Sequence, residues 1–147
     1  MAVNGSDASD TQAAQVFLPV RTAWAEPFWS GLAAGDLWIQ QCRACDRTVF
    51  PPVEEICPHC SAPYSWRRAS GKARLWSWTT FHREYYPGYP VPPPYTVLMV
   101  AIEEGLHMLG ALASSTPSAA LRCDMPLEFS PLQLAEGVFV PGFRPVG

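Results

Sequence analysis

The sequence predicts a mainly β protein, in which a short N-terminal helix and a cysteine-rich metal site precede a small antiparallel barrel. Three observations support this fold class. The 147 residues include 16 prolines and 10 glycines, which leave little room for long helices. Several apolar segments have the length of a strand and are separated by tight turns. No helices of crossover length alternate with these segments, which disfavours a parallel α/β sheet.

The N-terminal residues indicate neither export nor a membrane anchor. Residues 1–15 are small and polar, and we expect residues 1–25 to form a disordered or extended tail. They lack the basic and apolar segments of a secretory signal, and no apolar run reaches the roughly 18 residues of a membrane span. Five cysteines in such a chain are typical of metal ligands plus a spare thiol. We therefore expect a cytoplasmic protein without membrane contact.

Residues 26–40 are expected to hold the helix and a strand that follows it. Pro27 suits the first turn of a helix, and Gly35 suits its C-cap because glycine adopts the left-handed conformation at little cost. Residues 37–41 have strand character and lead into the first cysteine pair. Three apolar side chains would share one helix face at helical spacing: Phe28, Trp29 and Leu32.

Residues 41–66 are predicted to form a zinc ribbon. Two residues separate the cysteines within each pair, and the longer gap between the pairs lets a hairpin bring them together. The four cysteines are Cys42, Cys45, Cys57 and Cys60. Four thiolates at about 2.3 Å form a closed tetrahedral site, typical of one structural zinc ion. Iron is the alternative metal, because tetrahedral sulfur suits both. A closed site leaves no position for substrate, so the ion would not be catalytic.

The residues around the cysteines predict two details of the site. Glycine often follows the second cysteine of such a pair because it tolerates a positive φ, but Asp46 and Ser61 stand there. We therefore expect an altered geometry of these turns. His59 is expected to be exposed, because four sulfurs already satisfy the ion.

Residues 67–147 are predicted to form the barrel. The clearest strands are residues 72–82 and 95–102, since aromatic and β-branched residues suit a pleated surface. A hairpin turn at 103–105 leads to a return strand over 107–113. Further elements are expected at 87–94 (a stiff proline-rich loop), 116–122 (a helical turn), 126–129 and 138–140 (strands). On the first strand, Leu75, Ser77, Thr79 and Phe81 would alternate with Trp76, Trp78 and Thr80.

Several of these stretches, in this order, resemble the zinc-ribbon plus OB-fold family of acyl-CoA-associated proteins, formerly a domain of unknown function. The matching stretches are residues 27–32, both cysteine pairs, 50–52, 71, 94–95, 104–105 and 140–145. The resemblance covers about residues 26–145, and it implies a rubredoxin-like zinc ribbon followed by a five-stranded antiparallel OB-fold barrel. One departure lies at residues 123–126, where the family commonly has a glycine before the Met-Pro pair.

The resemblance implies a function as well. Proteins of this family resemble non-catalytic accessory subunits of thiolases, thiolase-like synthases, side-chain aldolases or hydratases. This chain would form a hetero-oligomer with a thiolase-like acyl-CoA enzyme, stabilise it, and help to bind or shield the shared CoA thioester substrate. The residues agree, because His82, His107 and the lone thiol of Cys123 lack the neighbours of a catalytic set. We expect no catalytic residue in this chain.

Two groups of residues are candidates for contacts with substrate and partner. Guanidinium and ammonium groups pair with phosphates, and aromatic rings stack on adenine. The candidate CoA-binding residues are Arg67, Arg68, Lys72, Arg74, Trp78 and His82, with a solvated strand face as the alternative. Aromatic residues are enriched at interfaces. The candidate partner interface is Phe28, Trp29, Tyr85, Tyr86 and Tyr89, with packing inside the chain as the alternative.

Two other functions remain open at this point. An OB barrel can stack the bases of single-stranded nucleic acid on its aromatic face. The net charge of −3 opposes this alternative, because a surface that binds a phosphate backbone is usually basic. A small zinc or iron electron carrier is the third possibility, and a visible colour in the purified protein would favour iron.

Overall fold

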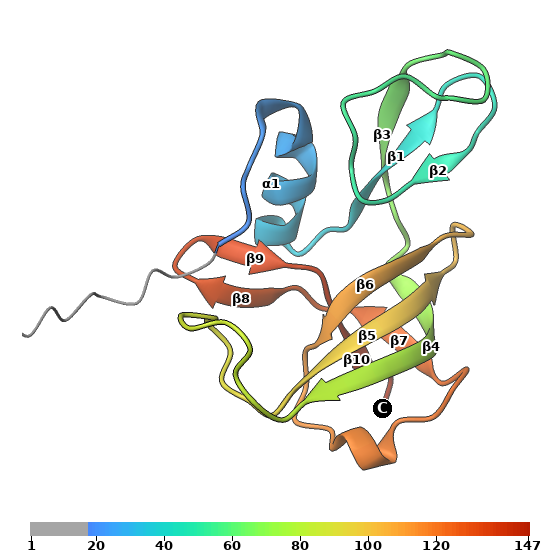
Figure 1. Cartoon of the computed structure of the whole chain (residues 1–147). Coiled ribbons are helices and arrows are strands. Elements are labelled where there is room, and N and C mark those ends of the chain that lie inside the picture. Colours follow the sequence, from blue (N-terminus) through green and yellow to red (C-terminus); the bar gives the residue numbers. More distant parts are fainter. Residues whose placement is uncertain (1–17) are drawn as a thin grey trace, which may run out of the picture.

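A computed structural model describes residues 18–147 (Figure 1). These residues form one α-helix, a three-stranded ribbon, a closed barrel and a separate hairpin, which confirms the predicted mainly β fold class. The predicted tail over residues 1–25 lies mostly outside the described residues. None of the helices in the described range is long and apolar enough to span a membrane.

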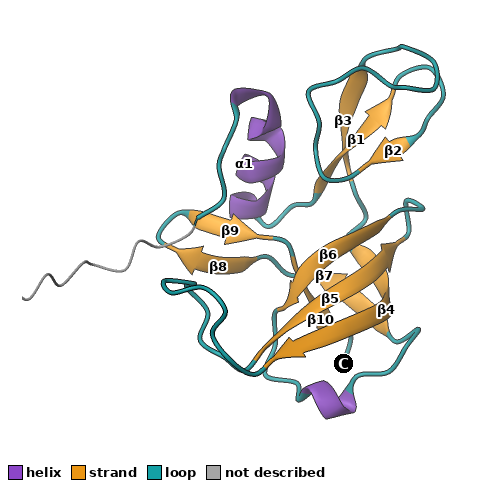
Figure 2. Cartoon of the chain, viewed as in Figure 1, coloured by secondary structure: helices purple, strands orange, loops and turns teal. Residues whose placement is uncertain are grey.

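The elements follow the chain in a simple order, and loops make up much of the remainder (Figure 2). The N-terminal part holds η1 (Ala23–Ala25), α1 (Glu26–Ala34), β1 (Trp38–Cys42), β2 (Thr48–Val49) and β3 (Tyr64–Arg68). The barrel part holds β4 (Lys72–Phe81), β5 (Tyr95–Ile102), β6 (His107–Leu112), η2 (Ser118–Ala120), β7 (Pro126–Phe129), β8 (Leu132–Ala135), β9 (Val138–Val140) and β10 (Gly142–Pro145).

Helix α1 begins and ends as its sequence predicts. Pro27 occupies the first turn, and Gly35 caps the helix at φ 84°, with its backbone N–H donating to the carbonyls of Gly31 and Leu32. A side chain at Gly31 would overlap the ring of Trp38, so this glycine lets the helix approach β1 closely. The helix packs on β1 and on β9 (Figure 1).

The barrel closes in the order β10-β6-β5-β4-β7. Every neighbouring pair is antiparallel except β10 and β6, which are parallel. One parallel pair is required because strand directions can alternate all the way round a closed ring only when the number of strands is even, and this barrel has five. The β8–β9 hairpin lies between β7 and β10 along the chain (Figure 1). The sequence pattern does not predict β8 or β10.

A bulge in β4 changes which of its side chains face the core. The pairing with β5 shifts by one residue between Leu75 and Ser77. Leu75 and Trp78 therefore pack inward, whereas Trp76 is 58% exposed. The predicted unbroken alternation was wrong, because a bulge inserts one residue into a strand and reverses the faces beyond it.

One hydrophobic core joins the ribbon side to the barrel. Phe28, Leu32 and Ile39 belong to the same buried cluster as Leu98 and Phe143 of the barrel. The connection between the two parts is also fixed by hydrogen bonds. The N–H of Ala69 donates to the carbonyl of Leu37 at 2.8 Å, and the N–H of Ser70 donates to the carboxylate of Glu104 at 2.6 Å. The ribbon is thus held on the barrel by burial and by directional bonds.

Candidate metal centre and substrate-facing surfaces

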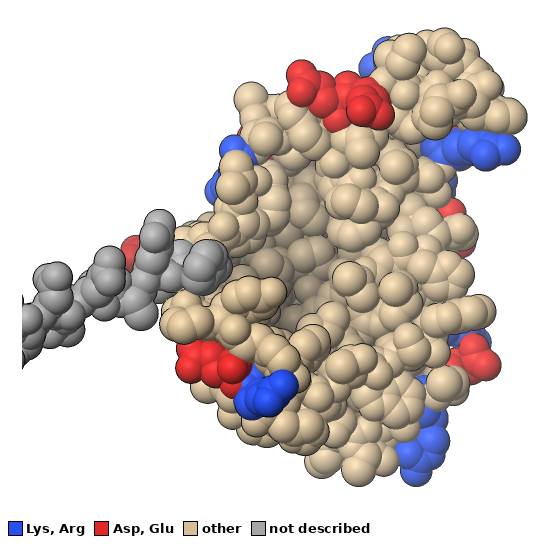
Figure 3. Space-filling model, viewed as in Figure 1, with Lys and Arg blue, Asp and Glu red and all other residues tan. Residues whose placement is uncertain are grey.

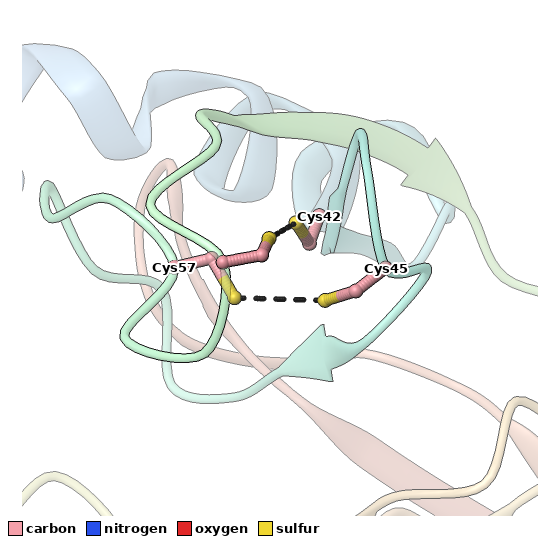
Figure 4. Close-up of side chains that lie close together, drawn as sticks. Cys42, Cys45 and Cys57 are labelled. Atoms are coloured by element: carbon pink, nitrogen blue, oxygen red, sulfur yellow. Dashed lines mark hydrogen bonds between the residues drawn. The ribbon is translucent and has the colours of Figure 1, made fainter.

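The four cysteine sulfurs form one cluster at the end of the ribbon. Cys42 lies at the end of β1, Cys45 in the turn that follows, and Cys57 and Cys60 in the second loop. Their Sγ atoms all lie within 4.8 Å of one another, with 3.3 Å between Cys42 and Cys60 and 3.7 Å between Cys45 and Cys57. Figure 4 shows the side chains pointing toward one another from facing loops.

The backbone folds tightly around these sulfurs. The N–H of Ser61 donates to the carbonyl of Cys57 at 2.8 Å, and the N–H of Cys42 donates to the carbonyl of Arg47 at 2.8 Å. Asp46 and Ser61 both adopt the left-handed conformation, with φ of 58° and 59°. The expected change in turn geometry was therefore wrong, because both residues accept the positive φ that glycine would supply. His59 is exposed, as predicted.

Backbone donors favour thiolates at two of the four positions. The N–H groups of His59 and Cys60 lower the pKa of Cys57 to about 6, and the N–H of Ala44, 3.5 Å from its Sγ, lowers the pKa of Cys42. At Cys60 the N–H of Ala62 favours the thiolate, but the sulfur of Cys42, burial and the other sulfurs outweigh it and raise the pKa to about 12. Four adjacent thiolates therefore need a cation among them.

The donor set fits a tetrahedral metal ion. Zinc–sulfur bonds of about 2.3 Å place neighbouring sulfurs about 3.8 Å apart, close to the separations of this cluster. Four thiolates and no vacant position are the chemistry of a structural zinc ion. The ion would tie the β1 turn to the second loop and thereby order a segment that has few strand hydrogen bonds.

The basic candidates lie near the joint between ribbon and barrel, but carboxylates accompany them. Arg68 forms an ion pair with Asp36, and the ammonium of Lys72 lies 3.9 Å from the carboxylate of Glu103. Arg74 donates to the backbone carbonyl of Asp124 at 2.7 Å. The shallow surface pocket beside Arg67, Arg68 and Lys72 is also lined by Asp36, Glu104 and Glu128. The local charge is therefore mixed, and each exposed pair contributes little stability.

The candidate CoA-binding residues do not converge on one place. Lys72 begins β4 and His82 follows its end, so the two lie about 30 Å apart at the rise of an extended strand. Trp78 lies between them and packs against the barrel core. A single CoA contact that uses all six residues would have to follow the whole length of β4.

The candidate partner residues divide into a buried and an exposed group. Phe28 is 3% exposed and lies 5.0 Å from the ring of Trp29, so its place at a partner surface is corrected: it fills the core of its own chain. Tyr85, Tyr86 and Tyr89 are exposed on the long loop between β4 and β5, residues 82–94, which we call the tyrosine loop. The ring of Tyr85 meets that of Phe81, and Tyr89 meets Tyr95 at 5.0 Å. These ring contacts hold the exposed aromatic side chains of the loop in place.

The remaining titratable candidates are His82, His107 and Cys123, and two of them lie beside Trp76. His107 packs edge-on against the ring of Trp76 at 4.6 Å on the outer face of the barrel. The exposed thiol of Cys123 lies 3.5 Å from the carbonyl of Trp76. His82 lies at the other end of β4, at the start of the tyrosine loop. Among the hydrogen bonds of residues 18–147, none joins two of these three groups.

Comparison with known proteins places these features in a family. The model of the ChsH2 rubredoxin-like zinc ribbon domain matches residues 29–65, and that of the ChsH2 C-terminal OB-fold domain matches residues 66–130. The chain belongs to the ChsH2-type zinc-ribbon and OB-fold family. This family assignment confirms the resemblance found in the sequence, and together with the sulfur cluster it supports a structural zinc ion.

Individual relatives agree with this family. Over 92 residues the chain is 34% identical to the 3-oxo-4,17-pregnadiene-20-carboxyl-CoA hydratase alpha subunit of Mycobacterium tuberculosis. The matched region is 62% of this chain but only 28% of that subunit. The solved structure of the Ltp2-ChsH2(DUF35) aldolase superposes with a TM-score of 0.75 at 25% identity, covering 86% of this chain and 98% of the other. A DUF35 protein of unknown function from Sulfolobus solfataricus shares the fold, with a TM-score of 0.55, 13% identity, and coverage of 84% and 86%.

Proposed function

We propose that this chain is a non-catalytic accessory subunit of an acyl-CoA enzyme complex. One observation carries the proposal: nearly the whole of a chain from the Ltp2-ChsH2(DUF35) aldolase, 98% of it, superposes on this protein. The substrate class comes from a second comparison, with the hydratase alpha subunit, whose name includes a CoA thioester.

The finer form of the proposal is a catalytic partner of thiolase type. Accessory subunits contact their catalytic partners through exposed surface. This protein has a broad hollow face whose charged side chains lie at the rim (Figure 3). The tyrosine loop after β4 projects beside it (Figure 1). Tyrosine is favoured at interfaces because its rigid ring buries a large area at little conformational cost. We assign partner contact to Tyr85, Tyr86 and Tyr89, and to the partly buried Trp29 on α1.

The zinc ion has a structural role in this proposal. Cys42, Cys45, Cys57 and Cys60 would hold it, and the bound metal would supply only cross-linking of the ribbon loops. The CoA phosphates would pair with exposed cations among Arg67, Arg68, Lys72 and Arg74. A phosphate there would compete with Asp36 and Glu103 for the same charges.

The proposal is tested by affinity capture from a native lysate, followed by mass spectrometry. We expect an acyl-CoA enzyme in near-equal amount, and we expect its activity to fall when this chain is absent. Tyr85→Ser should weaken the capture, whereas Trp76→Ser, an equally exposed aromatic on the outer barrel face, should leave it unchanged. Full aldol or thiolytic activity in the isolated chain would refute the accessory role. Capture of RNA or DNA in place of an enzyme would favour the nucleic-acid alternative.

A further inference from the structure

A pocket of about 480 Å³ opens at the end of the barrel where β4 and β6 end and β5 begins. Its walls come from distant parts of the chain: the tyrosine loop, the barrel end, the segment 114–118 and the β8–β9 hairpin. Its volume falls in the range of small-molecule sites, which are concave and mostly apolar. None of the residues placed in the candidate metal centre contributes to it.

The lining combines apolar side chains with several hydroxyl groups. Leu112, Leu132, Leu134 and Val140 form an aliphatic wall, with Tyr95 and Val97 on β5. The segment 114–118 adds four hydroxyl-bearing residues to the lining, Ser114, Ser115, Thr116 and Ser118. The hydroxyls of Thr80 and Thr96 lie 2.9 Å apart and satisfy each other. Such a lining suits a hydrocarbon group that carries a few uncharged oxygens.

The charge of the pocket lining indicates which half of a CoA thioester the pocket would bind. Among the described residues that line the pocket, no lysine, arginine, aspartate or glutamate occurs, and His82 is the one imidazole. The nucleotide half of CoA carries phosphates, which are costly to bury without cations. Burying the acyl half has no such cost, because this half carries no phosphate.

We propose that this pocket receives the acyl group of the thioester substrate, a largely hydrocarbon group with one or two uncharged oxygens. The inference rests on the proposed function for the identity of the thioester. The tyrosine loop forms one wall, with Tyr89 and Val91 facing the acyl group. The chain thus contacts the part of the substrate that distinguishes one acyl-CoA from another.

Equilibrium dialysis of the full-length, zinc-loaded chain tests the proposal with two uncharged probes, 1-decanol and progesterone. We expect at least one to bind. Ser115→Trp, which fills the pocket from its exposed rim, and Leu134→Asp, which places a charge on its aliphatic wall, should each weaken binding by about tenfold or more. The controls Ala119→Trp and Gln133→Asp make the same changes on neighbouring residues outside the lining, and they should bind as the wild type does. Circular dichroism confirms that each variant is folded.

Competition decides what the pocket accepts. Decanoyl-CoA should displace the probe, whereas CoA alone should not. Binding of neither probe, or equal binding by pocket variants and controls, would overturn the proposal. Displacement by CoA as effective as by decanoyl-CoA would assign the pocket to the other half of the thioester. If Ser115→Trp disrupts enzyme capture but leaves probe binding intact, the pocket holds a partner side chain instead. Failure of the accessory role appears separately, as absence of enzyme in the capture experiment.

Discussion

The parallel seam between β10 and β6 depends on a glycine, and its replacement should destabilise the barrel measurably. A methyl group at Gly110 would lie 2.7 Å from Cδ2 and 2.9 Å from Cε2 of Phe143, whose side chain is 0% exposed. The backbone at Gly110 has no positive φ, so the cost arises from steric overlap alone. Overpacking of this kind costs about 1–3 kcal/mol, and we expect about 2 kcal/mol for Gly110→Ala.

A double-mutant cycle isolates this contact. Phe143→Leu removes the ring and should by itself destabilise the protein, because it leaves space beside Phe129. In the double variant the leucine makes room for the new methyl group, so the combined cost should be about 1 kcal/mol smaller than the sum of the single costs.

The assay is urea unfolding followed by circular dichroism with zinc in excess. Gly147→Ala is the matched control, because a methyl group there meets no atom within 4 Å, and its effect should stay within about 0.5 kcal/mol. A neutral Gly110→Ala, or single costs that simply add, would contradict the packing of β10 against β6.

Two further predictions concern the ribbon. Cys57→Ser should lower the zinc content below one ion per chain and unfold the ribbon loops, because structural zinc contributes about 10–16 kcal/mol in small zinc domains. The control Cys123→Ser should keep the ion. Elemental analysis of both dialysed variants checks this, and an unchanged zinc content in Cys57→Ser would refute the ligand assignment. Asp46→Gly should stabilise the protein by up to about 1 kcal/mol, because the φ of 58° at this position suits glycine. The control Thr48→Gly, in strand β2, should destabilise the protein. Melting temperatures of both variants check this, and a lower value for Asp46→Gly would contradict the left-handed turn.

Local signals in the sequence predicted local features well. The cysteine spacing indicated a sulfur cluster, because two-residue gaps constrain both thiols of a turn wherever the rest of the chain lies. Pro27 and Gly35 marked the ends of α1 for the same reason: the backbone preferences of proline and glycine act within a few residues. The hairpin at residues 103–105 also follows from its own turn and flanking strands.

Features that depend on distant partners were not predictable in the same way. The bulge beside Trp76 is defined by register against β5, which an alternation pattern in one strand does not contain. The basic residues at the ribbon joint are close in sequence, but the topology brings Asp36 and Glu103 beside them from other segments. Strand β10 contains glycine and proline and pairs only through barrel closure. The barrel-end pocket likewise joins segments that are far apart in the chain.

The most direct test of the accessory role is capture of the tagged full-length chain from its native lysate, with quantitative mass spectrometry and zinc analysis of the same eluate. The account predicts one acyl-CoA enzyme in near-equal amount and one zinc ion per chain. Recovery of the chain by itself, or with nucleic acid as its main companion, would contradict the accessory-subunit proposal and leave the family assignment and the sulfur cluster standing.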